Sequence, residues 1–366
     1  MKTIALVGGG TAGHIWPTIE VGKALKKIDS ELKLLYLGVR GGQEEEIAQK
    51  QGFKFIPIES AKWDRFFSFK NVLTPYKILK GFFQAKRILR ENNVSALFAK
   101  GGFVSFPVIL AASRLHLPIV SHESDSVMGR TNLWLSRFIK KIAVAFPKSF
   151  YPKKIHQKLF YSGIPIRKDF YMVDKNQAKV KLNPDSNLPL LVVTGGSLGA
   201  LFLNQIIWEL LDLLLKHCQI IHLTGEKSIS EAEKIREKLN DEQKKRYKIF
   251  AFSQRMPEIL ASADLVVSRA GANTLFELAF LKKPAILVPY PYAAQKHQDK
   301  NAEFARSLGG AKVFFQDQFS KKEFIKAILY LLENQDEAKI MGEKLASLYK
   351  KNSADLIAGK ILKELR

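Results

Sequence analysis

Two glycine-rich turns could hold phosphate groups in this 366-residue chain. The first glycine turn is residues 8–14 (GGGTAGH) and the second is residues 195–200 (GGSLGA); each follows a short apolar run and opens a helix-like stretch. Glycine permits positive φ and close backbone approach, so such turns direct N–H donors toward an anion at a helix N-terminus. Either turn alone could be a plain strand-to-helix connection. As a pair, one near the start of each half, they predict two Rossmann-like domains facing one phosphate-bearing ligand.

His14 is the group in the first glycine turn that could move a proton. It falls in the first turn of the predicted helix, where the helix dipole lowers the pKa of an imidazole and favours its neutral form. A neutral imidazole can act as a general base. A histidine at a helix start can equally be a polar surface residue, so both interpretations stay open.

Further polar groups follow strands predicted in the second half. Residues 268–277 leave a strand and enter a helix, and their small side chains permit close backbone approach. The carboxylate of Glu277 could accept hydrogen bonds from two vicinal ribose hydroxyls, or could be solvated on the helix. His297 and Gln298 could bind sugar hydroxyls, or could simply begin a polar helix.

Two other kinds of site are disfavoured. A nicotinamide dinucleotide site needs an acidic residue at the end of the second strand, and residues 37–40 (LGVR) carry none. Glu123 and Asp125 form an acidic pair after a predicted strand, but no histidine or cysteine spacing typical of a metal site accompanies them. We therefore expect a site without a metal and without a cofactor.

Length and composition describe a folded, two-domain protein. The chain exceeds the usual size of a single core, and 46% hydrophobic with 25% charged residues argues against disorder. Cys218 is the sole cysteine, which excludes an intrachain disulfide and suits a reducing compartment. The N-terminal residues predict no signal peptide, and no apolar stretch reaches the roughly 18 residues of a spanning helix. These features predict a soluble, cytosolic chain.

The strand and helix pattern alternates in both halves, which predicts doubly wound parallel sheets. The strands expected in the first half are residues 2–7, 32–37, 53–58, 96–98, 119–121, 142–145 and 160–161. Those expected in the second half are residues 190–193, 220–223, 248–251, 265–268 and 285–289. Residues 164–189, which contain three prolines, are expected to connect the domains.

Positive charge is concentrated in one segment of the chain. The formal net charge is +23, and residues 51–168 hold 21 lysine and arginine residues against 5 acidic ones. Charge that served only solubility would be distributed over the whole chain. Its concentration predicts a polyanionic partner for the first half, either nucleic acid or an anionic membrane surface.

Residues 62–90 combine this charge with aromatic side chains. Thr74 and Pro75 predict a helix start, as N-cap and first helical residue. At about 100° per residue, the face expected on the core holds Ile78, Phe82, Ala85 and Leu89. The residues expected to point elsewhere are Tyr76, Leu79 and Phe83, with Lys80, Lys86, Arg87 and Arg90 around them.

An apolar patch ringed by cations suits a bilayer interface. A basic solvated helix and a platform for single-stranded nucleic acid are the alternatives. The absence of a known nucleic-acid motif disfavours the second of these.

Seven motifs, in this order and spacing, resemble the MurG family. They are GGGTAGH (8–14), KGGFVSFP (100–107), HESDSVMGRTNLWLSR (122–137), GIPIR (163–167), TGGSLGA (194–200), SRAGANTLFELA (268–279) and HQDKNA (297–302). Members of this family are bacterial glycosyltransferases that transfer N-acetylglucosamine from UDP-N-acetylglucosamine to lipid I, giving lipid II for peptidoglycan synthesis. That step serves cell-wall growth, cell shape and cell division.

The resemblance implies the GT-B fold, which is two Rossmann-like domains with the active site in a cleft between them. It implies an acceptor- and membrane-binding domain over residues 1–163, joined by a C-terminal helix of residues 346–366, and a UDP-sugar-binding domain over 164–345. It further implies inverting, metal-independent transfer at the cytoplasmic face of the cell membrane. The implied partners are UDP-N-acetylglucosamine, lipid I and an anionic membrane surface reached through Tyr76, Leu79, Lys80, Phe83 and Arg87, with no nucleic acid.

The resemblance also implies roles for individual residues, carried over by position. His14 becomes the general base, with Thr11, Ala12 and Gly13 beside the donor sugar and the acceptor; Ala12 stands where glycine is frequent. The residues implied to bind the donor are Asp125 (where asparagine is often found) at the sugar, Arg167 and Ser197 at the diphosphate, Ser253 at uracil, Ala272, Asn273, Thr274, Leu275, Phe276 and Glu277 around the phosphates and ribose, and His297 with Gln298 at the sugar hydroxyls. Gln254 and Arg255 replace a common acidic pair near the base.

Three alternatives to this function stay open. One is a GT-B transferase with another acceptor, and a second is a UDP-sugar epimerase. The third is a nucleic-acid-binding protein whose basic face is the functional surface.

Overall fold

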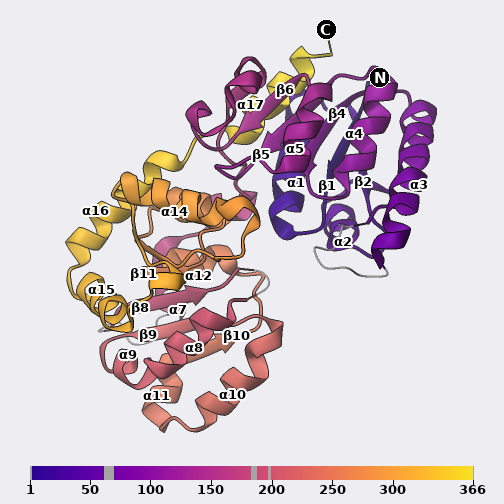
Figure 1. Ribbon diagram of the computed structural model, residues 1–366. Coiled ribbons are helices and arrows are strands. Elements are labelled where there is room, and N and C mark those ends of the chain that lie inside the picture. The colour runs from indigo at the N-terminus through magenta and orange to yellow at the C-terminus, as the bar shows by residue number, and fades with distance from the viewer. Residues whose placement is uncertain (1, 62–69, 183–187, 197–198, 366) are drawn as a thin grey trace. The chain divides into compact units, whose positions relative to one another are not determined.

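A computed structural model describes residues 2–61, 70–182, 188–196 and 199–365 of the chain (Figure 1). The chain divides into two compact units. The first unit is Met1–Arg167 together with Lys350–Arg366, and the second is Lys168–Tyr349. Each unit is built on one sheet with helices on both faces, and all strand pairs among the described residues are parallel. The expected α/β class with two Rossmann-like domains is confirmed.

The first unit contains a seven-stranded sheet of order β3-β2-β1-β4-β5-β6-β7. Its strands are β1 (Thr3–Gly8), β2 (Lys33–Gly38), β3 (Lys54–Pro57), β4 (Val94–Gly101), β5 (Ile119–Glu123), β6 (Lys141–Val144) and β7 (Leu159–Tyr161). Each coincides with an expected strand. Strands β1 and β4 are neighbours although β2 and β3 lie between them in the sequence, so the chain reverses its winding direction there. Ligands of open α/β sheets bind at such a switch point, beyond the carboxyl ends of the strands.

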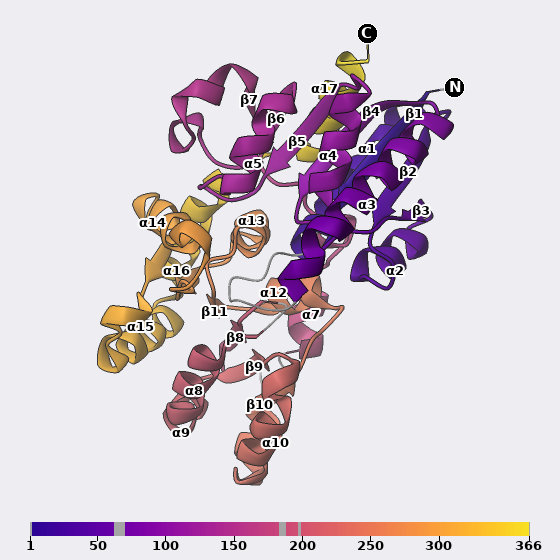
Figure 2. The ribbon, with the colours of Figure 1, turned by 45° about the vertical axis from the view of Figure 1, so that its right-hand side comes forward.

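Helices cover both faces of this sheet. They are α1 (Ala12–Ile28), α2 (Gln43–Lys50), α3 (Lys70–Glu91), α4 (Ser105–Arg114), α5 (Arg130–Leu135) and, from the chain's end, α17 (Ser353–Lys363). Helices α1 and α17 pack together on one face, where Ile15 and Ile19 join Ile357 and Ile361 in one buried core. Helices α3 and α4 lie side by side on the other face (Figure 2).

Helix α3 begins earlier than expected. The sequence placed its start at Thr74 and Pro75, whereas the helix is already formed at Lys70 and contains Pro75 in its interior. Proline removes one backbone hydrogen bond from a helix interior but does not prevent the preceding turn from forming. The local N-cap signal was therefore misleading here.

The second unit contains a six-stranded sheet of order β10-β9-β8-β11-β12-β13. Its strands are β8 (Leu190–Thr194), β9 (Gln219–Leu223), β10 (Tyr247–Phe250), β11 (Leu265–Ser268), β12 (Ala285–Leu287) and β13 (Ala311–Val313). The first five were expected. Strand β13 was not, because Lys312 in its middle interrupts the apolar run. The switch point of this sheet lies between β8 and β11, which are the strands that precede the second glycine turn and residues 269–277.

The helices of the second unit also form two layers. They are α6 (Lys168–Tyr171), α7 (Lys175–Leu182), α8 (Leu201–Glu209), α9 (Leu211–His217), α10 (Ile229–Glu237), α11 (Asp241–Arg246), α12 (Met256–Ser262), α13 (Ala272–Leu281), α14 (His297–Ser307), α15 (Lys321–Glu333) and α16 (Gln335–Leu345). Helices α8, α9 and α15 bury Leu203, Leu214 and Ile328 in one core with the strands. Helix α12 contacts α7, α13 and β8.

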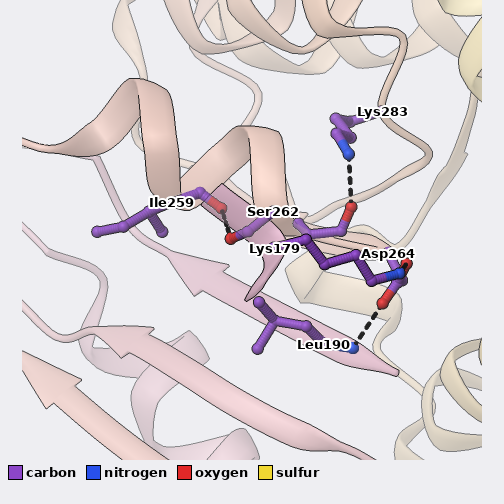
Figure 3. Close-up of polar contacts among 7 residues, drawn as sticks. Lys179, Leu190, Ile259, Ser262, Asp264 and Lys283 are labelled. Atoms are coloured by element: carbon purple, nitrogen blue, oxygen red, sulfur yellow. Dashed lines mark hydrogen bonds and ion pairs between the residues drawn. The ribbon is translucent and has the colours of Figure 1, made fainter. Parts of the chain in front are cut away.

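The segment expected as a connection, residues 164–189, contains α6 and α7. Helix α7 is tied to the sheet of the second unit through Asp264 (Figure 3). The carboxylate of Asp264 accepts hydrogen bonds from Lys179 Nζ at 2.7 Å and from the backbone N–H of Leu190 at 2.8 Å. The ammonium of Lys283 donates to the carbonyl oxygen of Ala263 beside it. These contacts assign α7 to the second unit at the amino end of β8.

Within the described ranges, no helix combines the length and the apolar character that crossing a bilayer requires.

Candidate active site

The first glycine turn connects β1 to α1 at the switch point of the first sheet. It lies against the loop after β4, because Gly102 adopts a φ of +82° and a Cβ there would lie 2.4 Å from the carbonyl oxygen of Gly9. Only glycine permits this approach without displacing the backbone. The two loops are therefore packed as one surface at the carboxyl end of the sheet.

Buried side chains hold the first glycine turn from beneath. The carboxylate of Glu44 accepts hydrogen bonds from the N–H groups of Gly10 (3.3 Å) and Val39 (3.2 Å). The hydroxyl of Tyr36 donates to the carbonyl oxygen of Gly8. Tyr36 and Glu44 were not identified from the sequence, since nothing local marks a side chain that reaches an adjacent loop.

His14 is the third residue of α1, and Thr11 is the N-cap. The Nδ1 atom of His14 lies 3.0 Å from the Thr11 hydroxyl, which fixes the ring beside the Gly101–Gly102 backbone. Burial, together with the charge of Lys100, lowers the pKa of His14 to about 3. The imidazole is therefore neutral near pH 7, as the sequence predicted. Burial is the larger cause of this pKa shift and the charge of Lys100 the smaller.

Lys100 lies at the centre of a polar cluster beneath the two loops. The side chain is buried, and its ammonium donates a hydrogen bond to the hydroxyl of Ser124. Burial lowers the pKa of Lys100 to about 8, against the opposing charges of Glu123 and Asp125. The carboxylate of Glu123 accepts a hydrogen bond from Asn132 Nδ2 at 2.9 Å, and burial raises its pKa. The cluster places the charge of Lys100 close enough to His14 to act on its pKa.

The sequence drew attention to Glu123 and Asp125 but gave no role to Lys100 or Asn132. The signal was present in the order of the strands, since Lys100 is the penultimate residue of β4 and Glu123 ends β5, its neighbour. Asp125 is half-buried, and its backbone carbonyl oxygen accepts a hydrogen bond from the Tyr151 hydroxyl at 2.9 Å. Its backbone N–H donates to Glu123 Oε1.

Arg167 belongs to the first unit by its contacts. Its guanidinium carbon lies 4.6 Å from the centre of the Trp16 ring, two residues beyond His14 on α1. A cation over an indole face is attracted by the ring quadrupole. The side chain of Arg167 is therefore held against α1, the helix that contains His14.

The second glycine turn occupies the equivalent position in the second unit, between β8 and α8. Gly196 and Gly199 have φ values of +81° and +74°, and a Cβ on Gly199 would lie 2.4 Å from the carbonyl oxygen of Thr224. The N–H of Gly196 donates to the Thr194 hydroxyl. Ser197, which was expected at the diphosphate, lies outside the described residues.

Helix α13 begins beside this turn, at the end of β11. Its first residues were expected to bind the donor, and their exposure separates them into two sets. The side chains of Ala272, Leu275 and Phe276 are buried, so only their backbone can meet a ligand. Asn273, Thr274 and Glu277 are half-exposed and retain side chains that a ligand can reach.

The loop after β10 contains Ser253, whose hydroxyl accepts a hydrogen bond from the N–H of Arg255 at 3.1 Å. Arg255 forms an ion pair with Glu258 on α12. The carboxylate of Glu258 therefore lies next to this loop, although Gln254 and Arg255 replace the acidic pair that is frequent in the MurG family.

A fourth loop leads from β12 to α14. The side-chain oxygen of Gln298 accepts a hydrogen bond from the backbone N–H of Tyr290 at 2.9 Å, and His297 Nδ1 lies 2.8 Å from the carbonyl oxygen of Ala294. Gln295 and Lys296 both have φ values of +53°, a strained backbone conformation for side-chain-bearing residues. Such strain often accompanies functional loops.

Arg269 supports this loop and was also missed from the sequence. Its guanidinium donates to the carbonyl oxygens of Val288 and Pro289, each at 3.0 Å, and to the side-chain oxygen of Gln316. The charged group is almost fully buried, and it replaces water as the partner of these carbonyl groups.

Helix α3 carries a separate surface feature. Tyr76, Leu79 and Phe83 are 63%, 55% and 59% exposed and Ala85 and Leu89 are buried, as the sequence predicted for these five residues. The outer surface of α3 is defined by Tyr76, Leu79, Lys80, Phe83, Gln84 and Arg87, which line a hollow of about 450 Å³. Ile78 and Phe82, expected on the core, are only partly buried.

Comparisons with known proteins cover both units. Residues 4–144 match the glycosyltransferase family 28 N-terminal domain, and residues 190–358 match the glycosyltransferase family 28 C-terminal domain. The chain is 36% identical over 338 residues to the UDP-N-acetylglucosamine--N-acetylmuramyl-(pentapeptide) pyrophosphoryl-undecaprenol N-acetylglucosamine transferase of Clostridium botulinum strain Hall, covering 92% of each chain. The enzyme of the same name from Clostridium perfringens strain SM101 is 37% identical over 336 residues, 91% of each chain.

Solved structures agree with these sequence matches. The crystal structure of Acinetobacter baumannii MurG has a TM-score of 0.73 at 26% identity, covering 99% of this chain and 100% of that chain. The glycosyltransferase of kitacinnamycin has a TM-score of 0.75 at 14% identity, covering 100% of this chain and 99% of that one. At so low an identity the second match shows the fold alone.

Proposed function

Since the chain belongs to the MurG family of glycosyltransferases, we propose that it transfers N-acetylglucosamine from UDP-N-acetylglucosamine to the 4-hydroxyl of the N-acetylmuramyl residue of lipid I, with inversion at the anomeric carbon. The product is lipid II, a precursor of peptidoglycan. The observation that carries this proposal is the similarity to named transferases along 92% of the chain, through both units.

His14 is proposed as the general base. In an inverting transfer the acceptor hydroxyl attacks the anomeric carbon as UDP departs, and a base must remove the hydroxyl proton in that step. The neutral ring of His14, oriented by Thr11, has the required form. Because burial and Lys100 keep its pKa at about 3, the free imidazole is a weak base. The opposite charge of a bound diphosphate raises the pKa of a nearby histidine, which would strengthen the base once the donor is in place.

The donor is proposed to bind the loops at the switch point of the second sheet. Charge develops on the leaving diphosphate, and the N-termini of α8 and α13 present backbone N–H groups and the positive ends of helix dipoles for it. Ser197 and Arg167 are proposed at the same diphosphate. Glu277 is proposed at the ribose hydroxyls, the backbone around Ser253 at uracil, and Gln298 with His297 at the sugar.

Asp125 and residues 11–13 are proposed beside the sugar and the acceptor. The ordered loops around Gly102 support this assignment, because they form one surface next to His14. A site without a metal is proposed as well, in which the cations and helix N-termini stabilise the leaving group.

The outer surface of α3 is proposed to bind an anionic membrane on the cytoplasmic side, where the lipid-linked acceptor resides. Three exposed apolar side chains beside Lys80 and Arg87 provide what an interfacial surface needs. The concentration of positive charge over residues 51–168 adds attraction to anionic lipid headgroups. Nucleic acid is not proposed as a partner.

The test is an assay of the purified protein with UDP-N-acetylglucosamine and a soluble lipid I analogue. The expected result is release of UDP in step with formation of a β-linked disaccharide product. UDP-glucose and an analogue lacking the 4-hydroxyl serve as controls. Product with a different acceptor only, or interconversion of the donor sugar without transfer, would replace this function by one of the alternatives considered above.

A further inference from the structure

A continuous chain of hydrogen bonds crosses the core of the second unit beneath the second glycine turn. The indole N–H of Trp208 donates to the hydroxyl of Tyr247 at 3.2 Å, and that hydroxyl lies 2.9 Å from His222 Nδ1. His222 Nε2 lies 3.0 Å from the side-chain oxygen of Asn204. Asn204 Nδ2 donates to the carbonyl oxygen of Thr224 at 2.9 Å. The chain thus runs from α8 through β10 and β9 and back to α8.

The two ends of this chain determine the direction of every bond in it. A carbonyl oxygen only accepts and an indole N–H only donates. The amide of Asn204 must therefore point its NH₂ at Thr224 and its oxygen at His222. His222 must then carry its proton on Nε2, which leaves Nδ1 to accept from the Tyr247 hydroxyl. One tautomer and one amide orientation satisfy all of the groups.

The chain ends where the second glycine turn rests. The carbonyl oxygen of Thr224 is the atom that a Cβ on Gly199 would approach to 2.4 Å. The backbone N–H of Asn204 donates to the carbonyl oxygen of Ala200, the last residue of that turn, at 2.9 Å. Asn204 therefore binds the end of the turn with its backbone and the floor beneath the turn with its side chain.

The floor itself connects to the loop that contains Ser253. The N–H groups of Thr224 and Gly225 donate to the carbonyl oxygens of Phe250 and Ala251, at 3.0 and 3.1 Å. Through Thr224, the hydrogen-bond chain thus joins the carboxyl ends of β8, β9 and β10. These are the segments to which the proposed function assigns the diphosphate and the uracil.

We propose that Asn204 and His222 are positioning residues for the donor nucleotide, holding Gly199 and Ala200 against the Thr224–Gly225 backbone so that the start of α8 is aligned before UDP-N-acetylglucosamine binds. The proposal rests on the proposed function. Neither side chain touches the donor, because both are almost fully buried. A purely apolar core could fill the same space, whereas a fully satisfied polar network also fixes the positions of the groups that it joins.

The surroundings of His222 keep its ring neutral, which the chain of hydrogen bonds requires. His222 is fully buried, and burial lowers its pKa to about 3. Trp208 and Tyr247 pack around its ring, and no charged group is among the causes of its pKa shift. The neutral tautomer therefore persists throughout the pH range in which the enzyme would work.

The test compares full-length variants that differ in how many of these hydrogen bonds they retain. Asn204→Leu and His222→Leu remove donor and acceptor together, and Tyr247→Phe removes one hydroxyl only. His222→Gln restores one donor and one acceptor. Leu214→Ala is the matched control, because Leu214 lies fully buried in the same core and takes no part in the chain.

The readouts are the KM for UDP-N-acetylglucosamine, kcat at saturating donor, the Kd of UDP by calorimetry, and the thermal midpoint. We expect Asn204→Leu and His222→Leu to raise the KM and the Kd by about tenfold or more, while kcat changes little. A tenfold change corresponds to the net stabilisation by roughly one buried hydrogen bond. His222→Gln should recover part of this loss. Leu214→Ala should lower the thermal midpoint but leave the KM near that of the unmodified protein.

Unchanged KM and Kd in the leucine variants would overturn the proposal, as would an equal rise of both in Leu214→Ala. If the leucine variants do not fold, the KM and Kd of Tyr247→Phe and nitrogen NMR of the unmodified protein test the proposal instead. The ring of His222 must show a protonated Nε2 and a bare Nδ1, and the opposite tautomer overturns the proposal. Absence of UDP binding by the unmodified protein would overturn the proposed function and this inference together, whereas normal binding in all variants would overturn the inference alone.

Discussion

At the scale of single residues, His14 combines a fixed ring with an environment that suppresses its charge. Lys100, buried beneath the loops, repels a proton on His14, while Glu123 and Asp125 balance the charge of Lys100 itself. A base in such surroundings depends on the charge of its substrate. The same arrangement allows the ring to be neutral in the free protein at any pH near neutrality.

Replacing His14 by alanine is expected to lower kcat by about 10²- to 10⁴-fold, the range of a lost general base. The Kd of UDP should change by less than about threefold, because no proposed nucleotide contact is removed. Steady-state kinetics with the soluble acceptor and calorimetry with UDP measure the two effects. Turnover close to that of the unmodified protein would remove His14 from the role of base.

A second prediction concerns the binding of the donor by Glu277. Glu277→Ala is expected to weaken UDP binding by about tenfold, since two hydrogen bonds from ribose hydroxyls to a charged acceptor are lost. Glu233→Ala, which removes an exposed carboxylate of α10, serves as the control. The assignment to the ribose fails if calorimetry gives both variants the same affinity for UDP as the unmodified protein.

At the scale of elements, α3 has two faces of different character. One face completes the core of the first unit through Ala85 and Leu89, and the other exposes apolar side chains next to cations. Two of those cations are partly compensated, by the ion pairs Lys80–Glu59 (3.3 Å) and Arg87–Glu91 (3.8 Å). Both pairs are largely exposed, so they are weak and leave the cations free to meet anionic headgroups.

The triple variant Tyr76→Ser, Leu79→Ser and Phe83→Ser is expected to lose binding to vesicles of phosphatidylglycerol and phosphatidylethanolamine, while transfer to a soluble acceptor persists. Flotation measures the binding, with RNA added to a parallel sample. The control is Met172→Ser with Val180→Ser, which removes apolar side chains that are 75% and 80% exposed in the second unit. Flotation that survives in the triple variant means that another surface binds the membrane, and retention by RNA would favour the nucleic-acid alternative.

At the scale of the whole molecule, buried histidines in both units connect stability to pH. Burial holds the pKa of His122 well below its ordinary value and lowers that of His222 to about 3. In the unfolded chain both take up a proton near pH 6.5. The unfolded state thus binds more protons below that pH, and folding stability falls as the pH drops from about 6.5 toward 3.

We expect the urea midpoint to be lower at pH 5 than at pH 7, because the free energy of unfolding falls by up to about 1.4 kcal/mol per histidine for each pH unit below 6.5. Glu123 opposes this trend, because burial raises its pKa and its protonation favours the folded state as the pH falls. His222→Gln should reduce the difference between the two midpoints, whereas His217→Gln, at an exposed position, should leave it unchanged. Equal midpoints for the unmodified protein at both pH values would contradict the assignment of neutral buried histidines.

The helices and strands were largely readable from local patterns. Short apolar runs predicted twelve of the thirteen strands found among the described residues, and the helical period predicted the exposed face of α3. Both patterns depend on residues within a few positions of one another. The local signal failed where a lysine interrupts the apolar run, in β13, and where a cap-like Thr-Pro pair lies inside a helix, in α3.

The glycine turns and His14 could likewise be identified from the residues themselves, since the conformations that need glycine are local. The groups around them could not. Lys100, Asn132 and Arg269 act on partners 24, 9 and up to 47 positions away, and the chain through His222 joins α8, β9 and β10. Sequence alone determined which residues could do chemistry, because residue type and local spacing suffice for that. Only the tertiary structure decided which of them meet, because the order in which parallel strands pair brings together loops that are distant in the chain.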